Sequence, residues 1–330
     1  MSERLLCIRD LRASFHTPAG HLPAVDGVDL EVRQGETLGI VGESGCGKSV
    51  TALSILRLLP EPPAEIERGE ILFKGRNLLQ LPHQELRHIR GNRIAMIFQE
   101  PMTSLNPVFR IGHQIEEVLE VHTDLDRSAR RSRVLELLEL VGIPAPPQRV
   151  RDYPHQLSGG MRQRVMIAMA LACDPEVLIA DEPTTALDVT IQAQILELLD
   201  RLKQRFHMAV LLITHDLGVV AQRADRIAVL YAGRVVETGP VRELFRSPRH
   251  PYTQGLLLSM PGAALERRSE LHVIPGAVPS LLDRPRGCSF RERCERASEL
   301  CARVDPRLEE LSAGRQLACH NPLPESGGGR

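Results

Sequence analysis

The chain has 330 residues, of which 42% are hydrophobic and 25% are charged, and its formal net charge is −1. This is the balance of a globular protein with a sizeable core and one or two domains, and the near-zero charge argues against a general nucleic-acid binder. With no Trp and three Tyr, few aromatic side chains could stack on single strands. No apolar run approaches the length of about 18–20 residues that is needed to cross a bilayer, and the N-terminal residues show no signal-peptide pattern. We therefore expect a cytoplasmic chain that reaches a membrane only through a partner.

Short apolar runs separated by helical patterns predict a largely parallel α/β sheet up to about residue 245. The runs are 38–41, 94–98, 177–180, 210–213 and 227–231. Between about 102 and 175 the pattern is mainly helical, and 188–206 reads as a long amphipathic helix. Beyond about 246, prolines break any long helix, so we place a domain boundary there. The tail 326–330 is expected to be disordered.

A phosphate-binding loop is predicted directly after the first apolar run. Residues 42–49 read Gly-Glu-Ser-Gly-Cys-Gly-Lys-Ser and match G-x-x-x-x-G-K-[ST] between a strand and a helix, the context that this motif requires. Lys48 is predicted to neutralise the β- and γ-phosphates, and the Ser49 hydroxyl to ligate Mg²⁺. Cys46 is interpreted as a small filler residue, with a lowered thiol pKa as the alternative. The cradle around the phosphates consists of Gly42, Glu43, Ser44, Gly45, Cys46 and Gly47.

Two carboxylates end the apolar run at 177–180. Asp181 and Glu182 stand at the carboxyl end of a buried strand, where α/β sheets bind ligands. Asp181 is predicted to hold Mg²⁺ through water, and Glu182 to polarise the attacking water as general base. Adjacent carboxylates elsewhere would be an ordinary solvated pair, so their position after four apolar residues carries the prediction.

A third segment makes the chain resemble the ATP-binding-cassette ATPases. Residues 157–161, Leu-Ser-Gly-Gly-Met, resemble the signature loop of that family, and Ser158 is placed to cap the helix that follows. The family's other elements, in order, are the Q-loop Gln99, the D-loop 186–188 and the switch histidine His215. The resemblance spans about residues 5–320. It implies catalytic roles for Gln99, Glu182 and His215, Mg²⁺ contacts for Ser49, Gln99 and Asp181, and nucleotide contacts for Ser158, Gly159, Gly160 and Asp188.

One position departs from the family pattern, and one family role has more than one candidate residue. Met161 replaces the usual Gln, which affects fine positioning but leaves the contacts of Ser158 and the glycine N–H groups. Phe15 is the candidate for stacking on adenine, with His21 as the alternative, and a core role for Phe15 is equally open. Because the chain carries one set of motifs, the resemblance implies that two ATPase subunits pair to close the site.

Further segments resemble the peptide/nickel importer group of this family. They are 96–107, 250–253, 283–288 and 318–320. The resemblance implies an ATPase that energises import of dipeptides or oligopeptides, with nickel, glutathione or another small solute as the alternative. It implies a related second ATPase subunit, two transmembrane permease subunits and, indirectly, an extracytoplasmic peptide-binding protein, at the cytoplasmic face of the inner membrane. Residues 102–107 directly follow Gln99 and are expected at the permease docking surface; the alternative is a plain turn.

Four of the seven cysteines, Cys288, Cys294, Cys301 and Cys319, crowd the last 43 residues. Without an export signal they read as thiols or metal ligands rather than disulfides. Their spacing is not the paired spacing of a zinc ribbon, but four thiolates suffice for a [4Fe–4S] cluster, which related importer ATPases carry here. Zinc or metal-free thiols are the alternatives. A bound cluster is expected to be structural and to leave ATP affinity nearly intact. Several arginines near these cysteines are interpreted as offsetting cluster charge or, alternatively, as ordinary solvated charges: Arg284, Arg286, Arg291, Arg293 and Arg296.

Together these patterns predict an α/β fold, a P-loop NTPase cassette over residues 1–245 with a mixed sheet, a small antiparallel sheet and a helical subdomain at about 102–175. A small cysteine-bearing extension follows at 246–330. One rival is a cassette ATPase of DNA repair or translation, which would need basic surfaces or long insertions. Another is an iron–sulfur redox sensor with a regulatory nucleotide site, against which the intact Glu182 and His215 argue.

Overall fold

The computed structural model describes residues 3–99, 104–185, 187–260, 273–282, 284–312 and 314–325. Ala186 of the D-loop, Asp283, the predicted tail, and Met102 and Thr103 of the predicted docking segment lie outside them. The chain divides into two compact units. Unit 1 comprises Met1–Glu3, Arg33–Glu36 and Gln80–Leu212, and unit 2 comprises Arg4–Val32, Thr37–Leu79 and Ile213–Arg330. Unit 2 thus contains residues from both sides of position 245. The domain boundary that the sequence predicts there stays a prediction.

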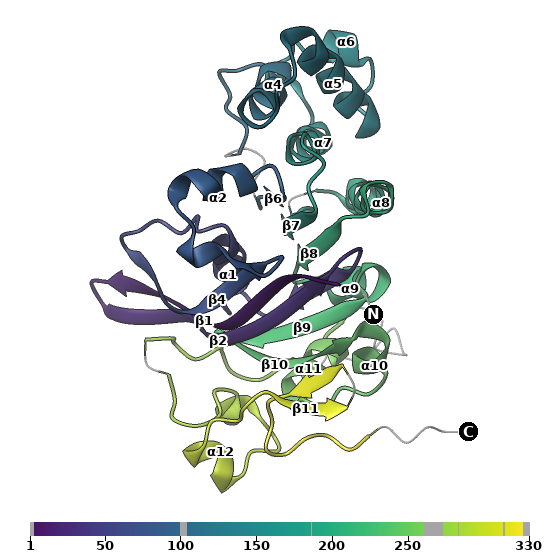
Figure 1. Ribbon diagram of the computed structural model, residues 1–330. Coiled ribbons are helices and arrows are strands. Elements are labelled where there is room, and N and C mark those ends of the chain that lie inside the picture. Colours follow the sequence, from purple (N-terminus) through teal and green to yellow (C-terminus); the bar gives the residue numbers. More distant parts are fainter. Residues whose placement is uncertain are drawn as a thin grey trace. The chain divides into compact units, whose positions relative to one another are not determined.

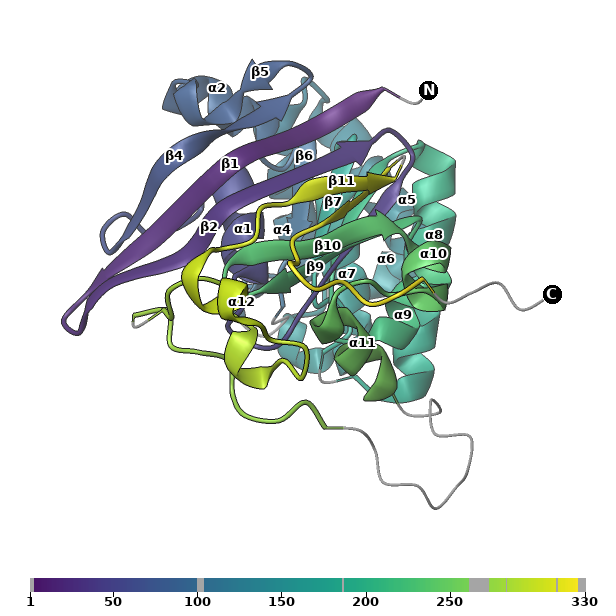
Figure 2. The ribbon, with the colours of Figure 1, turned by 90° about the horizontal axis from the view of Figure 1, so that it is seen from below.

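An antiparallel sheet forms the N-terminal part of unit 2, as the sequence predicts. Its strands, in the order β2-β1-β4-β5, are β2 (Gly20–Arg33), β1 (Arg4–Thr17), β4 (Ala64–Phe73) and β5 (Arg76–Asn77). Figure 2 shows the long strands β2, β1 and β4 side by side. The register of β1 against β4 shifts between Arg9 and Arg12. A Cβ at Gly69 would meet the Asp10 carbonyl oxygen at 2.7 Å, so the shifted strands require glycine there.

A second sheet of unit 2 combines parallel and antiparallel pairing. Within this unit its order is β11-β12-β10-β9-β3, and β3 pairs in parallel with β9 while β9, β10, β12 and β11 pair antiparallel. Strands β11 and β12 come from the C-terminal extension, for which the sequence analysis predicted no strands. The bounds are β3 (Thr37–Val41), β9 (Arg226–Tyr231), β10 (Arg234–Pro240), β11 (Glu309–Ser312) and β12 (Arg315–Leu317). Every residue of β3 is buried, as expected for a strand covered on both faces.

Helices and an aromatic cluster complete unit 2. The helices are α1 (Lys48–Ile55), α9 (Leu217–Arg223), α10 (Val241–Arg246), α11 (Pro251–Leu258) and α12 (Glu299–Arg303), with 3-10 turns η1 (Leu78–Gln80) and η3 (Arg291–Arg293). The ring of Tyr231 on β9 lies 4.7 Å from that of Tyr252 on α11 and 5.2 Å from that of Phe290, centroid to centroid. Such edge-on pairs contribute about 0.5–1.5 kcal/mol each beyond burial. The extension therefore shares its core with the sheet.

Unit 1 contains the predicted helical region. Its strands follow the order β8-β7-β6, with β6 parallel to β7. Figure 1 shows α4, α5 and α6 gathered beside α7. The bounds are α2 (His83–Ile89), β6 (Ile94–Ile97), α4 (Ile111–His122), α5 (Arg127–Leu140), α6 (Pro146–Arg149), η2 (Pro154–Gln156), α7 (Gly159–Ala170), β7 (Val177–Asp181), α8 (Val189–Phe206) and β8 (Ala209–Ile213). None of the helices in the described ranges has both the length and the apolar character of a membrane span.

A buried carboxylate ties the extension to β10. Glu237 is fully buried, and Arg315 of β12 donates to its carboxylate from Nη2 at 2.8 Å. The backbone N–H groups of Arg249 and His250, at the start of α11, donate to the same carboxylate at 2.9 and 3.0 Å. One charge therefore holds β10, β12 and the N-terminus of α11 together.

Replacing Glu237 by Ala should destabilise the protein strongly, because the buried Arg315 guanidinium loses its carboxylate partner and the N–H groups of Arg249 and His250 lose their acceptor. Loss of one partner of a buried ion pair costs about 3–5 kcal/mol. Urea unfolding followed by circular dichroism measures it. Glu310→Ala on the exposed face of β11 is the control and should stay within about 0.5 kcal/mol of the parent. Equal stability of the two variants would contradict the assigned role of Glu237.

Candidate nucleotide-binding and catalytic site

The phosphate loop joins β3 to α1 and is shaped by two glycines at its ends. A Cβ on Gly42 would meet the carbonyl oxygen of Leu230 at 2.3 Å, and one on Gly47 would meet that of Ala24 at 2.5 Å. Gly47 also has a φ of 100°, a region that favours glycine. The loop is therefore pressed against the neighbouring backbone of unit 2, and both motif glycines are required by geometry.

Lys48 lies folded over this loop with little exposure to solvent. Its Nζ donates to the carbonyl oxygens of Gly42 at 2.8 Å and Glu43 at 3.1 Å. These acceptors compensate the desolvated ammonium and hold it at the centre of the loop, where its charge can neutralise phosphate.

The Cys46 side chain is fully buried within the loop. Burial raises the pKa of its thiol, and the nearby Lys48 charge only partly opposes this. The alternative of a lowered thiol pKa is therefore wrong, because desolvation disfavours the thiolate more than the lysine favours it. The interpretation of Cys46 as a small filler residue stays a prediction.

The candidate catalytic region of unit 1 is built on the parallel pair β6 and β7. Asp181 is the buried last residue of β7, and Glu182 follows it with a left-handed φ of 45°. The Glu182 carboxylate accepts from the Thr185 hydroxyl at 2.8 Å and from Gln99 Nε2 at 3.1 Å. Ile97 pairs with Ala180, so the register places the residues after both strands side by side. A non-glycine residue in this backbone region costs about 1–3 kcal/mol, which is characteristic of functional sites.

Sequence reasoning brought Gln99 and Glu182 into one site but missed Thr185. The sequence does contain a signal for Thr185, because it stands three residues after the glutamate. At that spacing a hydroxyl can reach the carboxylate across one turn. The hydroxyl fixes the rotamer of Glu182 while Gln99 approaches from the neighbouring strand end. The arrangement holds a carboxylate in one orientation at the end of a sheet, which is the requirement for a positioned general base.

The signature loop and the D-loop pack against each other in unit 1. Ser158 caps α7 by accepting from the Met161 N–H at 3.3 Å, and Asp188 caps α8 by accepting from the Ile191 N–H at 2.9 Å. A Cβ on Gly160 would lie 2.8 Å from Ile191 Cγ2, and one on Gly159 would touch the Leu187 side chain at 3.5 Å. The glycines therefore let the first turn of α7 approach the start of α8, and they leave N–H groups at a helix N-terminus that suits an anion.

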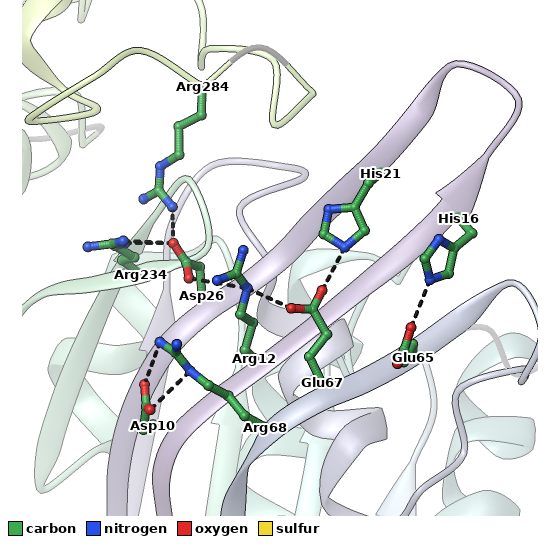
Figure 3. A network of polar contacts seen from close by, with 10 residues as sticks. All are labelled: Asp10, Arg12, His16, His21, Asp26, Glu65, Glu67, Arg68, Arg234 and Arg284. Atoms are coloured by element: carbon green, nitrogen blue, oxygen red, sulfur yellow. Dashed lines mark hydrogen bonds and ion pairs between the residues drawn. The ribbon is translucent and has the colours of Figure 1, made fainter.

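The remaining predicted residues belong to unit 2. His215 is exposed between β8 and Asp216, which caps α9 by accepting from the Gly218 N–H at 2.8 Å. Phe15 is half-buried near the end of β1, opposite Ala64 of β4. His21 instead faces Glu67, with Nε2 2.7 Å from the carboxylate (Figure 3). The adenine-stacking role of Phe15 stays a prediction.

Comparisons with known proteins agree with this geometry. The family described as ABC transporter matches residues 25–185, and the C-terminal region of oligopeptide/dipeptide transporters matches residues 236–301. The oligopeptide transport ATP-binding protein OppD of Bacillus subtilis is 54% identical over 309 residues, which cover 94% of this chain and 86% of that protein. The chain belongs to the ATP-binding-cassette family of transporter ATPases.

Other relatives extend the match over almost the whole cassette ATPase. The dipeptide transport ATP-binding protein DppD of Escherichia coli is 50% identical over 323 residues, 98% of each chain. Among solved structures, the dimeric ATP-binding cassette MJ0796 in a post-hydrolysis state with ADP and phosphate matches with a TM-score of 0.64. It is 30% identical and covers 72% of this chain and 99% of its own. The predicted cassette fold is confirmed, and the chain is an ATP-hydrolysing enzyme.

The four C-terminal cysteines of the cassette ATPase influence one another. Burial, together with the neighbouring thiols, raises the pKa of Cys288 and of Cys319 to about 11, and burial also raises the pKa of Cys294. Backbone N–H groups two residues later, at Phe290, Arg296 and Asn321, hydrogen-bond to these three sulfurs. The Asn321 amide also donates to Cys301 Sγ at 3.3 Å. Within the described ranges, no three His, Cys, Asp or Glu side chains form a group that could hold a metal ion.

Sequence reasoning also missed a buried charge network in unit 2 (Figure 3). Asp26 of β2 accepts from Arg234 Nη2 at 2.7 Å and from Arg284 of the extension. Burial works against the charged carboxyl, but the hydrogen bond and charges of Arg234, Arg284 and Arg12 outweigh it and lower the pKa of Asp26. The interpretation of the arginines near the cysteines as solvated charges is therefore wrong for Arg284, and it is also wrong for Arg293, whose buried side chain pairs with Glu43.

Proposed function

We propose that this ATPase hydrolyses ATP to energise import of dipeptides or short oligopeptides. The observation that carries the proposal is the match of residues 236–301 to the C-terminal region of oligopeptide/dipeptide transporters, in addition to the cassette itself. The relatives at 50–54% identity bear oligopeptide and dipeptide transport names and match over most of their lengths. Purifying the chain with its permease and identifying the peptide whose uptake depends on it would test the cargo. Uptake of a metal ion or other solute, but of no peptide, would overturn it.

In hydrolysis, each site residue has a role that its chemistry supports. The Ser49 hydroxyl, the Asp181 carboxylate and the Gln99 amide oxygen are hard oxygen donors of the type that Mg²⁺ prefers. When bound, Mg²⁺ would neutralise charge on the transferred phosphoryl group. Lys48 adds positive charge at the loop, and Glu182, oriented by Thr185 and Gln99, takes the proton of the attacking water. His215 and, from a second subunit, the signature residues Ser158 to Gly160 and Asp188 complete the closed site.

Glu182→Gln should bind ATP and accumulate an ATP-bound dimer, while turnover falls by about 10²–10⁴-fold, the usual contribution of a general base. The amide can still accept from Thr185 but cannot take a proton. Phosphate release measures turnover, and size-exclusion chromatography with ATP measures the dimer. Glu197→Gln, on an exposed position of α8, is the matched control and should hydrolyse normally. Turnover near the parent rate in Glu182→Gln would refute the assignment.

The chain would act at the cytoplasmic face of the membrane through two permease subunits and a related second ATPase subunit. Two exposed apolar side chains follow the Q-loop: Val108 and Phe109, exposed by 70% and 46%. Leu105, within the predicted docking segment, is only 1% exposed and packs in the core. Leu105 therefore cannot offer a contact, and we shift the proposed docking surface to Val108 and Phe109.

Changing Val108 and Phe109 together to Asp should abolish the stimulation of ATP hydrolysis by the permease subunits, because the pair is proposed to dock on them. Hydrolysis by the isolated chain should stay unchanged, since both side chains lie outside the site. Val121→Asp, exposed by 56% at the far end of α4, is the control. Stimulation equal to the parent in the double variant would place docking elsewhere.

We also propose that the four C-terminal thiols hold one [4Fe–4S] cluster. The thiols are close enough to influence one another, and three of them receive backbone N–H hydrogen bonds. A cubane takes one cysteine on each of its four irons, so four thiols in one segment match its donor number. Zinc, which also takes four thiolates, is the alternative. When bound, the cluster would contribute order to a segment with little regular structure.

Anaerobically purified protein should be brown and contain about four iron and four sulfide per chain. Replacing any one of Cys288, Cys294, Cys301 or Cys319 by Ser should bleach the colour, because each thiolate would bind one iron. Cys7→Ser and Cys173→Ser are the controls and should keep it. Stoichiometric zinc without sulfide would favour the zinc alternative, and a metal-free, well-ordered protein would exclude both.

A further inference from the structure

Glu43, the second residue of the phosphate loop, is held from outside the loop at both its backbone and its side chain. Its N–H donates to the Tyr252 hydroxyl oxygen at 3.0 Å. Its carboxylate accepts from Arg293 Nη1, which lies 2.9 Å from one oxygen and 3.1 Å from the other. Tyr252 and Arg293 both come from the stretch that matches the C-terminal region of oligopeptide/dipeptide transporters. Neither belongs to a nucleotide motif.

Arg293 is fixed in place by the extension around it. Its Nε donates to the Pro275 carbonyl oxygen at 2.9 Å, and its guanidinium lies 5.7 Å from the ring centroid of Tyr231 and 5.9 Å from that of Phe290. The side chain is only 5% exposed, whereas that of Glu43 is 30% exposed. A guanidinium restrained on several sides loses little further freedom when it binds a carboxylate. The link between loop and extension is therefore stiff.

The charge of Glu43 explains why such a partner is needed. The loop binds a polyphosphate, so a carboxylate on its second residue repels the ligand unless a cation neutralises it. Lys48 Nζ donates to the carbonyl oxygens of Gly42 and Glu43, and in the proposed mechanism its charge serves the phosphates. Arg293 supplies the missing positive charge from 250 residues away in the chain.

We propose that Arg293 is a positioning residue of the phosphate loop, which neutralises Glu43, and that through it the C-terminal extension sets the affinity for ATP. This role depends on the ATPase identity of the chain and not on the peptide cargo or on a bound cluster. The expectation that a bound cluster leaves ATP affinity nearly intact is a separate one, because it concerns the cysteines and not Arg293.

Arg293→Gln should weaken binding of a non-hydrolysable Mg²⁺–ATP analogue by about three- to tenfold, the size of a partly screened charge interaction. Calorimetry on the full chain measures the dissociation constant. The KM for ATP should rise by a similar factor, while kcat at saturation changes little, because the loop still forms once the nucleotide is bound. Arg293→Lys should recover part of the affinity, since it keeps the charge. Arg303→Gln is the control; that arginine is 75% exposed on α12 and pairs only with Glu299 among the contacts described for it.

The double variant Glu43→Gln/Arg293→Gln separates charge neutralisation from loss of folding. If Arg293 acts by neutralising Glu43, the double variant should bind the analogue more tightly than Arg293→Gln alone. Tyr252→Phe keeps the ring but removes the oxygen that accepts from the Glu43 N–H, and it should also weaken binding. Parent-like affinity in both Arg293→Gln and Tyr252→Phe would overturn the proposal. So would a double variant as weak as Arg293→Gln alone.

Discussion

The buried carboxylate of Glu237 is the contact on which the organisation of unit 2 depends. It pairs with Arg315 of β12 and accepts the N–H groups that open α11. Because a desolvated charge is stable only when all its partners are present, the extension must dock in one register for β10 to remain in the core. This docking places Tyr252 within the aromatic cluster with Tyr231 and Phe290. The hydroxyl of Tyr252 then reaches the phosphate loop.

Three carboxylates of unit 2 follow one pattern. Asp26, Glu43 and Glu237 are each paired with an arginine of the extension, namely Arg284, Arg293 and Arg315. The extension therefore supplies cations to a cassette whose own sequence places negative charge beside the sheet and the loop. This cassette is built around its C-terminal region rather than merely followed by it. The segment with the four C-terminal cysteines is joined directly to one of these ion pairs, since Cys294 follows Arg293 in the chain.

In unit 1, hydrogen bonds and the local backbone set the orientation of the candidate catalytic carboxylate, Glu182. Glu182 has a left-handed backbone and is oriented by Thr185 and Gln99. The parallel register of β6 and β7 delivers Gln99 and Glu182 to the same edge, so sheet pairing brings together groups separated by 83 residues. In the same unit, Gly160 allows the signature helix to approach the start of α8.

The sequence alone determined the features that local chemistry dictates. The phosphate loop follows from glycine spacing, the cap at Ser158 follows from a side chain that accepts an N–H group, and the buried strands follow from short apolar runs. Only the tertiary structure decided the partners of Glu43, Asp26 and Glu237, the burial that raises the pKa of the Cys46 thiol, and the burial of Leu105. A local pattern reports how a residue prefers to be surrounded, but not which distant residue surrounds it. Contacts such as that of Asp26 with Arg284, 258 residues apart, depend on sheet order and register, which no window of sequence contains.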